Sequence, residues 1–185
     1  MNVKTIPRSQ PTDEPVTLNQ AKEQLRLELS DTLDDAYIGA LISSARQRAE
    51  DYCNRFFTVK SVAILYDGAF PAGDIELPYP DLQTVDSVTY VDGDGNPQAV
   101  SAGQYTLDSD AQLITNSSGW PSDAVRYTVT VTTGVPANME SVKQAILMMV
   151  ADMYELRTES VVGTVVADNP AVLTALHFHR VELGI

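Results

Sequence analysis

Hydrophobic residues recur at intervals of three to four positions over residues 18–29, with polar residues between them. This spacing places the apolar side chains along one stripe and predicts an amphipathic helix over about 18–29. Thr17 and Gln20 stand at the separation of a capping box, in which each side chain satisfies a free N–H group of the other residue. The helix should therefore begin after Thr17. The stripe consists of Leu18, Ala21, Leu25 and Leu29.

The same periodicity predicts a second helix over about 33–55. Asp34 and Asp35 fall in its first turn, where the partial positive charge of a helix N-terminus favours carboxylates. The expected buried face consists of Ile38, Leu41, Ile42, Ala45, Ala49, Tyr52 and Cys53. The residues expected to face water or another chain are Arg46, Arg48, Glu50, Asp51 and Arg55.

The pattern changes to alternation between about residues 59 and 133. Short segments rich in β-branched and aromatic residues are separated by turn formers, which predicts an antiparallel sheet. In the last segment the odd-numbered positions from Val125 to Val131 are apolar and alternate with polar ones, so one face should be buried and the other wet. The predicted strands are 61–66, 74–77, 85–91, 104–107, 112–115 and 125–132.

Helical spacing returns after Pro136 and predicts a third helix over about 138–157, whose broad apolar face should pack against the first two. Pro170 suits the first turn of a short helix over about 170–178, with Asn169 as its N-cap. The predicted fold class is α+β, a small helical bundle with an inserted antiparallel β subdomain over about 59–133. The expected parts are an extended arm over 1–16, a helical body over 17–57 and 137–157, an acidic β subdomain over 58–136, and a loop, short helix and tail for partner contacts over 158–185.

Composition narrows the class of protein. A chain of 185 residues with 44% hydrophobic content suits one domain with an insertion. The single cysteine, Cys53, lies on the apolar face of the second helix, so we expect a buried small residue in a reducing compartment. There is no apolar run of membrane-spanning length and no apolar core of a signal peptide near the N-terminus, so membrane association and secretion are not expected.

The formal net charge is −13, and residues 56–136 contribute most of it, with ten acids and two bases. Such a surface repels nucleic-acid phosphates, so tight binding to DNA is not expected. The only nucleic-acid role that this charge allows is a passage through which DNA moves without adhering. Solubility alone is the simpler interpretation of the charge.

Candidate catalytic and metal-binding motifs are incomplete. Residues 92–96 open like a calcium loop, but Pro97 and Gly103 occupy the positions of the required glycine and bidentate acid, which favours a hairpin turn. His177 and His179 lack a third zinc ligand. No phosphate-binding glycine loop or nucleophile elbow is present. We therefore expect no enzyme activity, cofactor or metal.

Five segments, taken in order, carry a family resemblance. They are PVTLNQAKEQLRL, DDAYIGALISSARQRAEDYCNR, LPYPDLQTVDSVTYVDGDGNPQ, YTVTVTTGVP and VKQAILMMVADMYELR. Together they resemble the head–tail connector proteins of tailed bacteriophages, specifically the longer, sheet-containing branch of the gp6-like adaptor family, over about residues 15–157. Cys53 and Asn54 replace the family's usual glycine, and the chain after Arg157 resembles nothing in the family.

The resemblance implies a virion protein that forms a ring, with twelve subunits expected, beneath the portal. Such a ring extends the DNA channel and docks the stopper or tail, so the implied location is the virion neck, reached from the host cytoplasm during assembly. Lateral ring contacts are expected at Arg46, Arg48 and Arg55, although solvated helix surface is the simpler interpretation of each. Portal contacts are expected at Val161, Val162, Val165, Leu173, Leu176, Phe178, Arg180 and Ile185.

Two other functions stay open. One is an acidic β-sandwich that binds glycan or calcium, which requires a clustered aromatic platform or a complete cation loop. The tyrosines and the tryptophan that could form such a platform are too scattered in the sequence: Tyr79, Tyr90, Tyr105 and Trp120. The other is a hydrolase that uses turn carboxylates, which requires two of them in one pocket with shifted pKa values.

Overall fold

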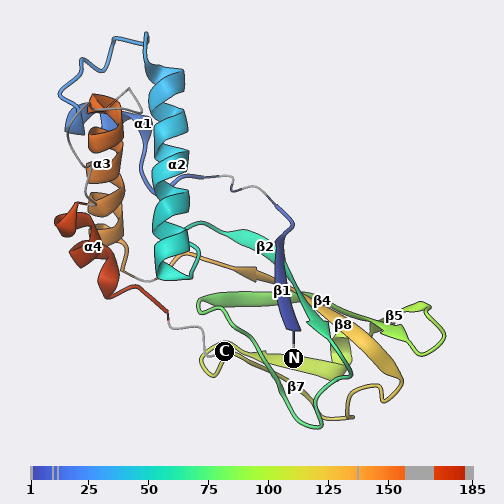
Figure 1. The fold of residues 1–185 in the computed structure, drawn as a ribbon. Helices are drawn as coiled ribbons and strands as arrows, with labels where there is room; N and C mark the ends of the chain where they lie inside the picture. The colour runs from blue at the N-terminus through green and yellow to red at the C-terminus, as the bar shows by residue number, and fades with distance from the viewer. Residues whose placement is uncertain (1, 10, 12, 137, 157–168, 182–185) are drawn as a thin grey trace. The chain divides into compact units, whose positions relative to one another are not determined.

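The computed structural model describes residues 2–9, 11, 13–136, 138–156 and 169–181 (Figure 1). The chain forms two compact units, and each is described by itself. The helical unit comprises residues 13–57 and 136–182, and the β unit comprises residues 1–12, 58–135 and 183–185. Helices and antiparallel strands are both present, which confirms the predicted α+β class.

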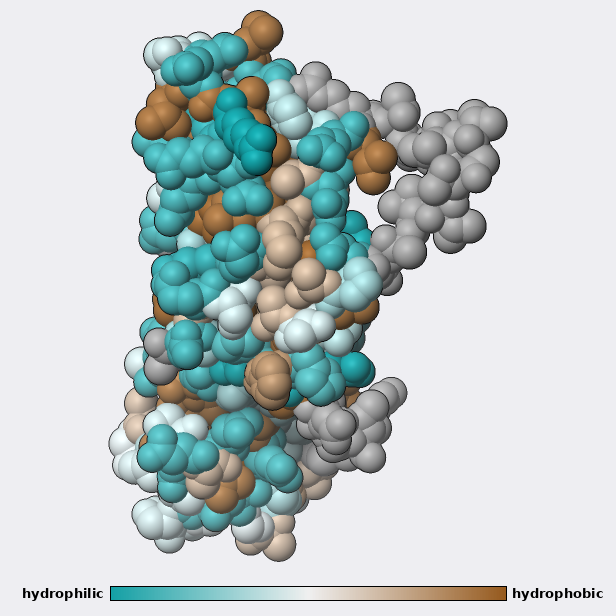
Figure 2. Space-filling view, turned by 90° about the vertical axis from the view of Figure 1, so that its left-hand side faces the viewer, coloured by the Kyte–Doolittle hydropathy of each residue, from teal (hydrophilic) through white to brown (hydrophobic). Residues whose placement is uncertain are grey.

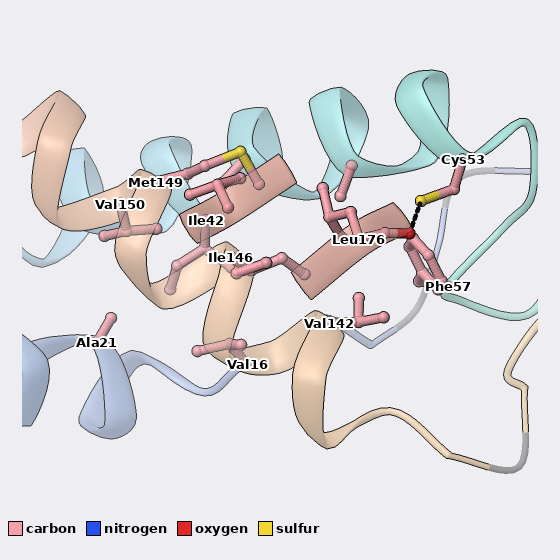
Figure 3. Packing of buried hydrophobic residues seen from close by; sticks show 14 of the residues in the cluster. Val16, Ala21, Ile42, Cys53, Phe57, Val142, Ile146, Met149, Val150 and Leu176 are labelled. Atoms are coloured by element: carbon pink, nitrogen blue, oxygen red, sulfur yellow. Dashed lines mark hydrogen bonds between the residues drawn. The ribbon is translucent and has the colours of Figure 1, made fainter. Parts of the chain in front are cut away.

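In its described residues, the helical unit contains four helices around an apolar core (Figure 3). They are α1 (Leu18–Gln24), α2 (Asp35–Cys53), α3 (Glu140–Glu155) and α4 (Pro170–His177). The core contains the expected faces of the second and third helices, because residues spaced by three and four positions fall on one side of a helix. Its fully buried members from these helices include Ile38, Ala45, Ala49, Val142, Ala145 and Ile146.

Helix α1 is shorter than predicted. Its capping box is confirmed: the Gln20 N–H donates to Thr17 Oγ1 at 3.2 Å, and the Thr17 N–H donates to Gln20 Oε1 at 2.9 Å. The helix ends at Gln24 because Arg26 adopts a left-handed conformation with φ 58°, which a continuing helix does not allow. The expected extension to residue 29 is therefore wrong, although the apolar spacing continues that far.

Helix α4 belongs to the helical core. Val172 and Leu176 are 6% and 2% exposed. The Leu176 carbonyl lies 3.5 Å from Cys53 Sγ at the end of α2, as the dashed line in Figure 3 shows. Asn169 caps α4 as predicted, by accepting a bond from the Ala171 N–H at 3.1 Å. The short helix therefore buries its apolar side within its own chain, in contrast to the partner-contact role expected for residues 158–185.

The described strands of the β unit form two antiparallel sheets. One has the strand order β1-β2-β8-β4-β5 and the other β3-β7-β6. Six of the strands were expected from the sequence, but as a single sheet. The strands are β1 (Asn2–Pro7), β2 (Lys60–Asp67), β3 (Ile75–Glu76), β4 (Leu82–Asp92), β5 (Pro97–Val100), β6 (Tyr105–Asp108), β7 (Leu113–Asn116) and β8 (Ala124–Thr133).

Strand β1 corrects the expectation of an extended N-terminal arm. Residues 2–7 pair with β2 in antiparallel register, with Ile6 opposite Ala63. The pairing partner is more than 50 residues away, and local pattern alone does not specify such a contact.

Each outer strand of the five-stranded sheet carries a proline. The Arg8 N–H donates to the Ser61 carbonyl at 2.8 Å, so by antiparallel alternation the neighbouring Pro7 directs its ring nitrogen away from β2. The Asp92 N–H donates to the Asn96 carbonyl at 3.0 Å, and the same alternation turns Pro97 away from β4. Both prolines therefore remove a backbone donor from an outward-facing position.

Strand β8 confirms most of the predicted alternation. Tyr127, Val129 and Val131 are buried, at 2%, 0% and 0% exposure. Val125 is 52% exposed, so its expected burial is wrong. A register shift between β4 and β8 at Asp92 changes the alternation at this end of the strand.

Gly134 allows the chain to leave β8 beside the start of β2. Its φ is +121°, and a Cβ atom there would lie 2.0 Å from the Thr58 carbonyl oxygen. The Gly134 N–H donates to the Asp81 carbonyl at 3.2 Å. Glycine is required because any side chain would collide with fixed backbone.

Candidate assembly surfaces

Arg46 lies at the centre of a buried ionic network in the helical unit. Its side chain is 3% exposed, with Nε 2.7 Å from Glu14 Oε2 and Nη1 2.7 Å from Glu50 Oε2. The other carboxylate oxygens also have donors, because the Ser43 hydroxyl donates to Glu14 at 2.8 Å and the Phe57 N–H donates to Glu50 at 3.0 Å. The network joins the segment before α1, the middle of α2 and the chain just after α2.

The expectation that Arg46 and Glu50 face water or another chain is wrong. These two residues are 2% and 6% exposed. The burial of Arg46 depends on Glu14, which reaches it from 32 positions earlier in the sequence. Since both carboxylates are in its own chain, Arg46 positions the segment before α1 and is not accessible for a lateral contact.

The other two predicted lateral residues differ in exposure. Arg48 is exposed on α2. Arg55 is half-buried, and its Nη1 donates to the His179 carbonyl at 3.3 Å. Arg55 therefore uses part of its hydrogen-bonding capacity within the chain, and lateral contact by either arginine stays a prediction.

The residues predicted to contact the portal are not equivalent. Leu176 is 2% exposed in the helical core, which excludes it as a surface contact in this fold. Leu173 is half-buried, Phe178 is 88% exposed, and Arg180 is exposed with its guanidinium carbon 5.4 Å from the centre of the Tyr52 ring. The others lie outside the described residues: Val161, Val162, Val165 and Ile185.

A buried lysine organises the loop between α1 and α2. The Lys22 side chain is 3% exposed, and its Nζ donates to the carbonyls of Leu29 at 3.3 Å and Asp31 at 2.6 Å. The same ammonium lies 2.5 Å from Asp35 Oδ1. Sequence reasoning missed this site, because Lys22 lies between the apolar positions of α1 and suggested only a solvated helix face.

The end of the helical unit that holds this loop exposes large apolar side chains. Leu29 is 47% exposed, Leu33 88%, Tyr37 37% and Leu156 43%. Figure 2 shows hydrophobic atoms among hydrophilic ones at the top of this unit. Tyr154 ties the C-terminal end of α3 to the start of α2, since its hydroxyl donates to Asp34 Oδ2 at 2.5 Å and its ring lies 6.1 Å from that of Tyr37.

Aromatic side chains gather in the β unit. The Phe70 ring lies 4.2 Å from Tyr127, 5.0 Å from Trp120 and 5.8 Å from Tyr90, measured between ring centres, and Tyr105 lies 6.5 Å from Trp120. The expectation of scattered aromatic residues is therefore wrong for Tyr90, Tyr105 and Trp120, because the fold brings together segments that are distant in the sequence, whereas the cluster defined by these ring contacts does not include Tyr79. Phe70 stacks on Tyr127 and Trp120 and meets Tyr90 edge to face. Tyr105 and Tyr127 are buried, whereas Phe70, Tyr90 and Trp120 are half-buried, so the cluster is partly open to solvent.

The Asp92 loop is a hairpin, as predicted. The Asp92 carboxylate accepts the N–H groups of Asp94 at 3.1 Å and Asn96 at 2.8 Å, and the Gln98 amide donates to it at 3.1 Å. The hydrogen bond from the Asn96 backbone, followed by that from the Gln98 side chain, lowers the pKa of Asp92. Its oxygens therefore stabilise the turn, and the described residues contain no group of three or more potential metal ligands.

Cys53 is buried, as predicted, at 0% exposure. Burial raises the pKa of its thiol to about 11, with a smaller opposing effect of Arg55. A thiol of this kind is a weak nucleophile at neutral pH. Within the described part of the chain, the helices are too short or too polar to cross a membrane.

Comparisons with known proteins agree with the sequence resemblance. Residues 15–84 match the family described as phage gp6-like head–tail connector protein. No curated protein matches the chain. Among solved structures, the chain is similar to one in the virion of a native gene transfer agent (GTA) particle, with a TM-score of 0.70 and 19% identity.

Two further similar chains come from neck structures. One is in the neck of an empty GTA particle computed with C6 symmetry, with a TM-score of 0.68 and 18% identity. The other is in the neck of a native GTA particle computed with C12 symmetry, with a TM-score of 0.61 and 18% identity. All three alignments cover 97% of this chain and 95% of the other, which establishes a shared fold.

The resemblance recognised in the sequence is thus confirmed: residues 15–84 match the gp6-like head–tail connector family, and nearly the whole chain has the fold of a chain found in GTA necks.

Proposed function

We propose that the protein is a head–tail connector of a virion neck, with a structural role. In this role twelve copies form a ring beneath the portal, extend the DNA channel and provide a docking surface for the stopper or tail. The observation that carries the proposal is the combination of a connector-family match over residues 15–84 with a full-length fold match to chains in GTA necks. The C12 symmetry of one of those necks supports a ring of twelve.

The charge distribution suits a channel through which DNA passes without adhering. Residues 56–136 contain ten acids and two bases. A surface of this sign repels phosphates, so a channel wall built from it would bind passing DNA weakly. The same repulsion disfavours a role in tight DNA binding.

Two arginines of the helical unit, the exposed Arg48 and the half-buried Arg55, are candidates for contacts between subunits. We assign Arg48 and Arg55 to lateral contacts with carboxylates of the adjacent copy, and Leu173, Phe178 and Arg180 to portal contacts. Phe178 is the strongest of the portal candidates, because an aromatic ring that is 88% exposed gains most from burial in a partner. The assembly pathway would start from free subunits in the host cytoplasm and end in the virion neck.

The mass of the protein in solution tests this proposal. The purified chain, of 20.1 kDa, is measured by native mass spectrometry alone and with purified portal rings from the same phage. We expect a ring of twelve copies, either in the chain alone or bound to the portal, because a portal can template a ring that does not form by itself. A monomer that stays unbound in the presence of portal would contradict the proposal.

A further inference from the structure

The exposed apolar end of the helical unit has the character of a preformed docking element. We define it as the loop tip, which consists of residues 25–34 together with Tyr37 and Leu156. We propose that the loop tip inserts into an apolar pocket with a basic rim on another protein of the phage head or neck. This inference rests on the proposed connector function.

The first support is exposed apolar surface. Leu33 is 88% exposed and Leu29 is 47% exposed, on a loop that leads directly into α2. Tyr37 and Leu156, which are 37% and 43% exposed, lie at the same end because Tyr154 bonds to Asp34. Several large apolar side chains at one end of a folded unit are typical of an interaction site.

The second support is the fixed conformation of the loop. The Lys22 ammonium donates hydrogen bonds to the carbonyls of Leu29 and Asp31. Asp35 forms an ion pair with the same ammonium. The Asp31 carboxylate also accepts the Leu33 N–H at 3.0 Å. Burying an ammonium is unfavourable unless its donors are satisfied, so this arrangement stabilises one particular loop shape. A loop held in one shape loses less conformational entropy when it docks.

The third support is the charge around the apolar side chains. Glu28 and Asp31 are exposed, Asp34 is half-buried, and Arg26 is the exposed base of the loop. Because carboxylates outnumber the exposed base, the complementary surface on a partner should be basic around an apolar centre. The same charges disfavour docking to DNA.

A second copy of this chain is a weaker occupant. The acidic loop tip would be repelled by the mainly acidic surface of a second copy, whose net charge is −13. The β unit does have a pocket of about 410 Å³ lined by Lys4 and Arg126, but Asp67 also lines it and would repel the carboxylates of an inserted loop tip.

Site-specific photocrosslinking tests the partner. A benzophenone amino acid replaces Leu33, and the labelled protein is added to DNA-filled heads purified from an infection in which the connector gene is disabled. We expect crosslinks between position 33 and a head or neck protein other than this chain. Crosslinks to another copy of this chain, or none at all in heads that bind the labelled protein, would overturn the proposal.

Binding of variants to the same heads supplies the second measurement. We expect L33D to bind at least tenfold more weakly and E28K severalfold more weakly, whereas V125D, at a site that is 52% exposed in the β unit, should bind like the unmodified protein. Unchanged circular dichroism of L33D establishes that the helices are folded. Equal binding of L33D and the unmodified protein would refute only the docking role of the loop tip. Heads that do not bind even the unmodified protein would refute the connector function.

Discussion

The buried network around Arg46 makes a quantitative prediction about stability. The substitution Arg46→Met keeps most of the side-chain volume but removes both ion pairs, each at 2.7 Å. Glu50 would keep its negative charge at 6% exposure and would lose Arg46 as its ion-pair partner, while the Phe57 N–H still donates to it. Removing one partner of a buried ion pair costs about 3–5 kcal/mol, because the other charge stays buried without that counter-ion. This is a large part of the roughly 5–15 kcal/mol that stabilises a typical domain.

Urea unfolding followed by circular dichroism at 222 nm measures the effect on the helices. Fluorescence of Trp120, the single tryptophan, reports separately on the β unit. The double variant R46M/E50Q is the matched control, because the glutamine keeps an acceptor for the Phe57 N–H and carries no charge. We expect it to recover stability, so that its loss relative to the unmodified protein is about 1–2 kcal/mol.

Two results would refute the reasoning about this network. If R46M unfolds within about 0.5 kcal/mol of the unmodified protein, the pairs contribute no more than exposed surface pairs do. If R46M/E50Q is as unstable as R46M, the loss does not come from the Glu50 charge, since position 50 carries no charge in the double variant.

Three other predictions follow from single positions. Gly134→Ala should lower the free energy of unfolding by more than about 2 kcal/mol, because its Cβ atom would collide with backbone. Gly103→Ala, with open space around it, should change this free energy little, and Trp120 fluorescence in urea measures both variants. The Cys53 thiol should resist Ellman's reagent at pH 8 until the protein unfolds. Because its folded pKa of about 11 exceeds the ordinary value of 9.0, the stability that the neutral thiol contributes is complete below pH 9 and is lost between pH 9 and 11. The urea midpoint of Cys53→Ala should therefore fall less over that range than the midpoint of the unmodified protein. Leu176→Ala should lose about 2–5 kcal/mol in thermal or urea unfolding, whereas Phe178→Ala should stay within about 0.5 kcal/mol; equal losses would contradict the packing of α4.

The helical faces could be predicted because they depend on local spacing. In α3, residues such as Val142, Ile146 and Met149 recur every three or four positions, and all three are buried. The capping box at Thr17 was equally accessible, since it involves residues three positions apart. Periodicity and capping operate within one or two helical turns, so a sequence pattern contains the whole cause.

The remaining features depend on residues that are distant in the sequence. The apolar spacing alone suggested a longer helix, but α1 ends at the left-handed Arg26, and Lys22 then holds the following loop through the carbonyls of Leu29 and Asp31. The burial of Arg46 depends on Glu14, which lies in a segment without helical or strand pattern. In both cases a charged side chain is buried by partners that only the tertiary structure brings to it.

The candidate surfaces show the same limit. Hydrophobicity suggested Leu176 and Phe178 alike as partner contacts, but one is 2% exposed and the other 88%. A short helix with an apolar side can dock within its own chain or on another protein, and its pattern is the same in both cases. In the structure α4 packs on the helical core of its own chain, which buries Leu176. Of these two residues, only the exposed Phe178 stays a candidate for contact with a partner.

The prolines of the outer strands bear on how free copies of the protein meet in concentrated solution. Pro7 and Pro97 each remove an outward-facing backbone donor from an outer strand of the five-stranded sheet, so a ladder formed with another copy along either strand would lack a hydrogen bond at that position. Both prolines therefore disfavour edge-to-edge aggregation through this sheet.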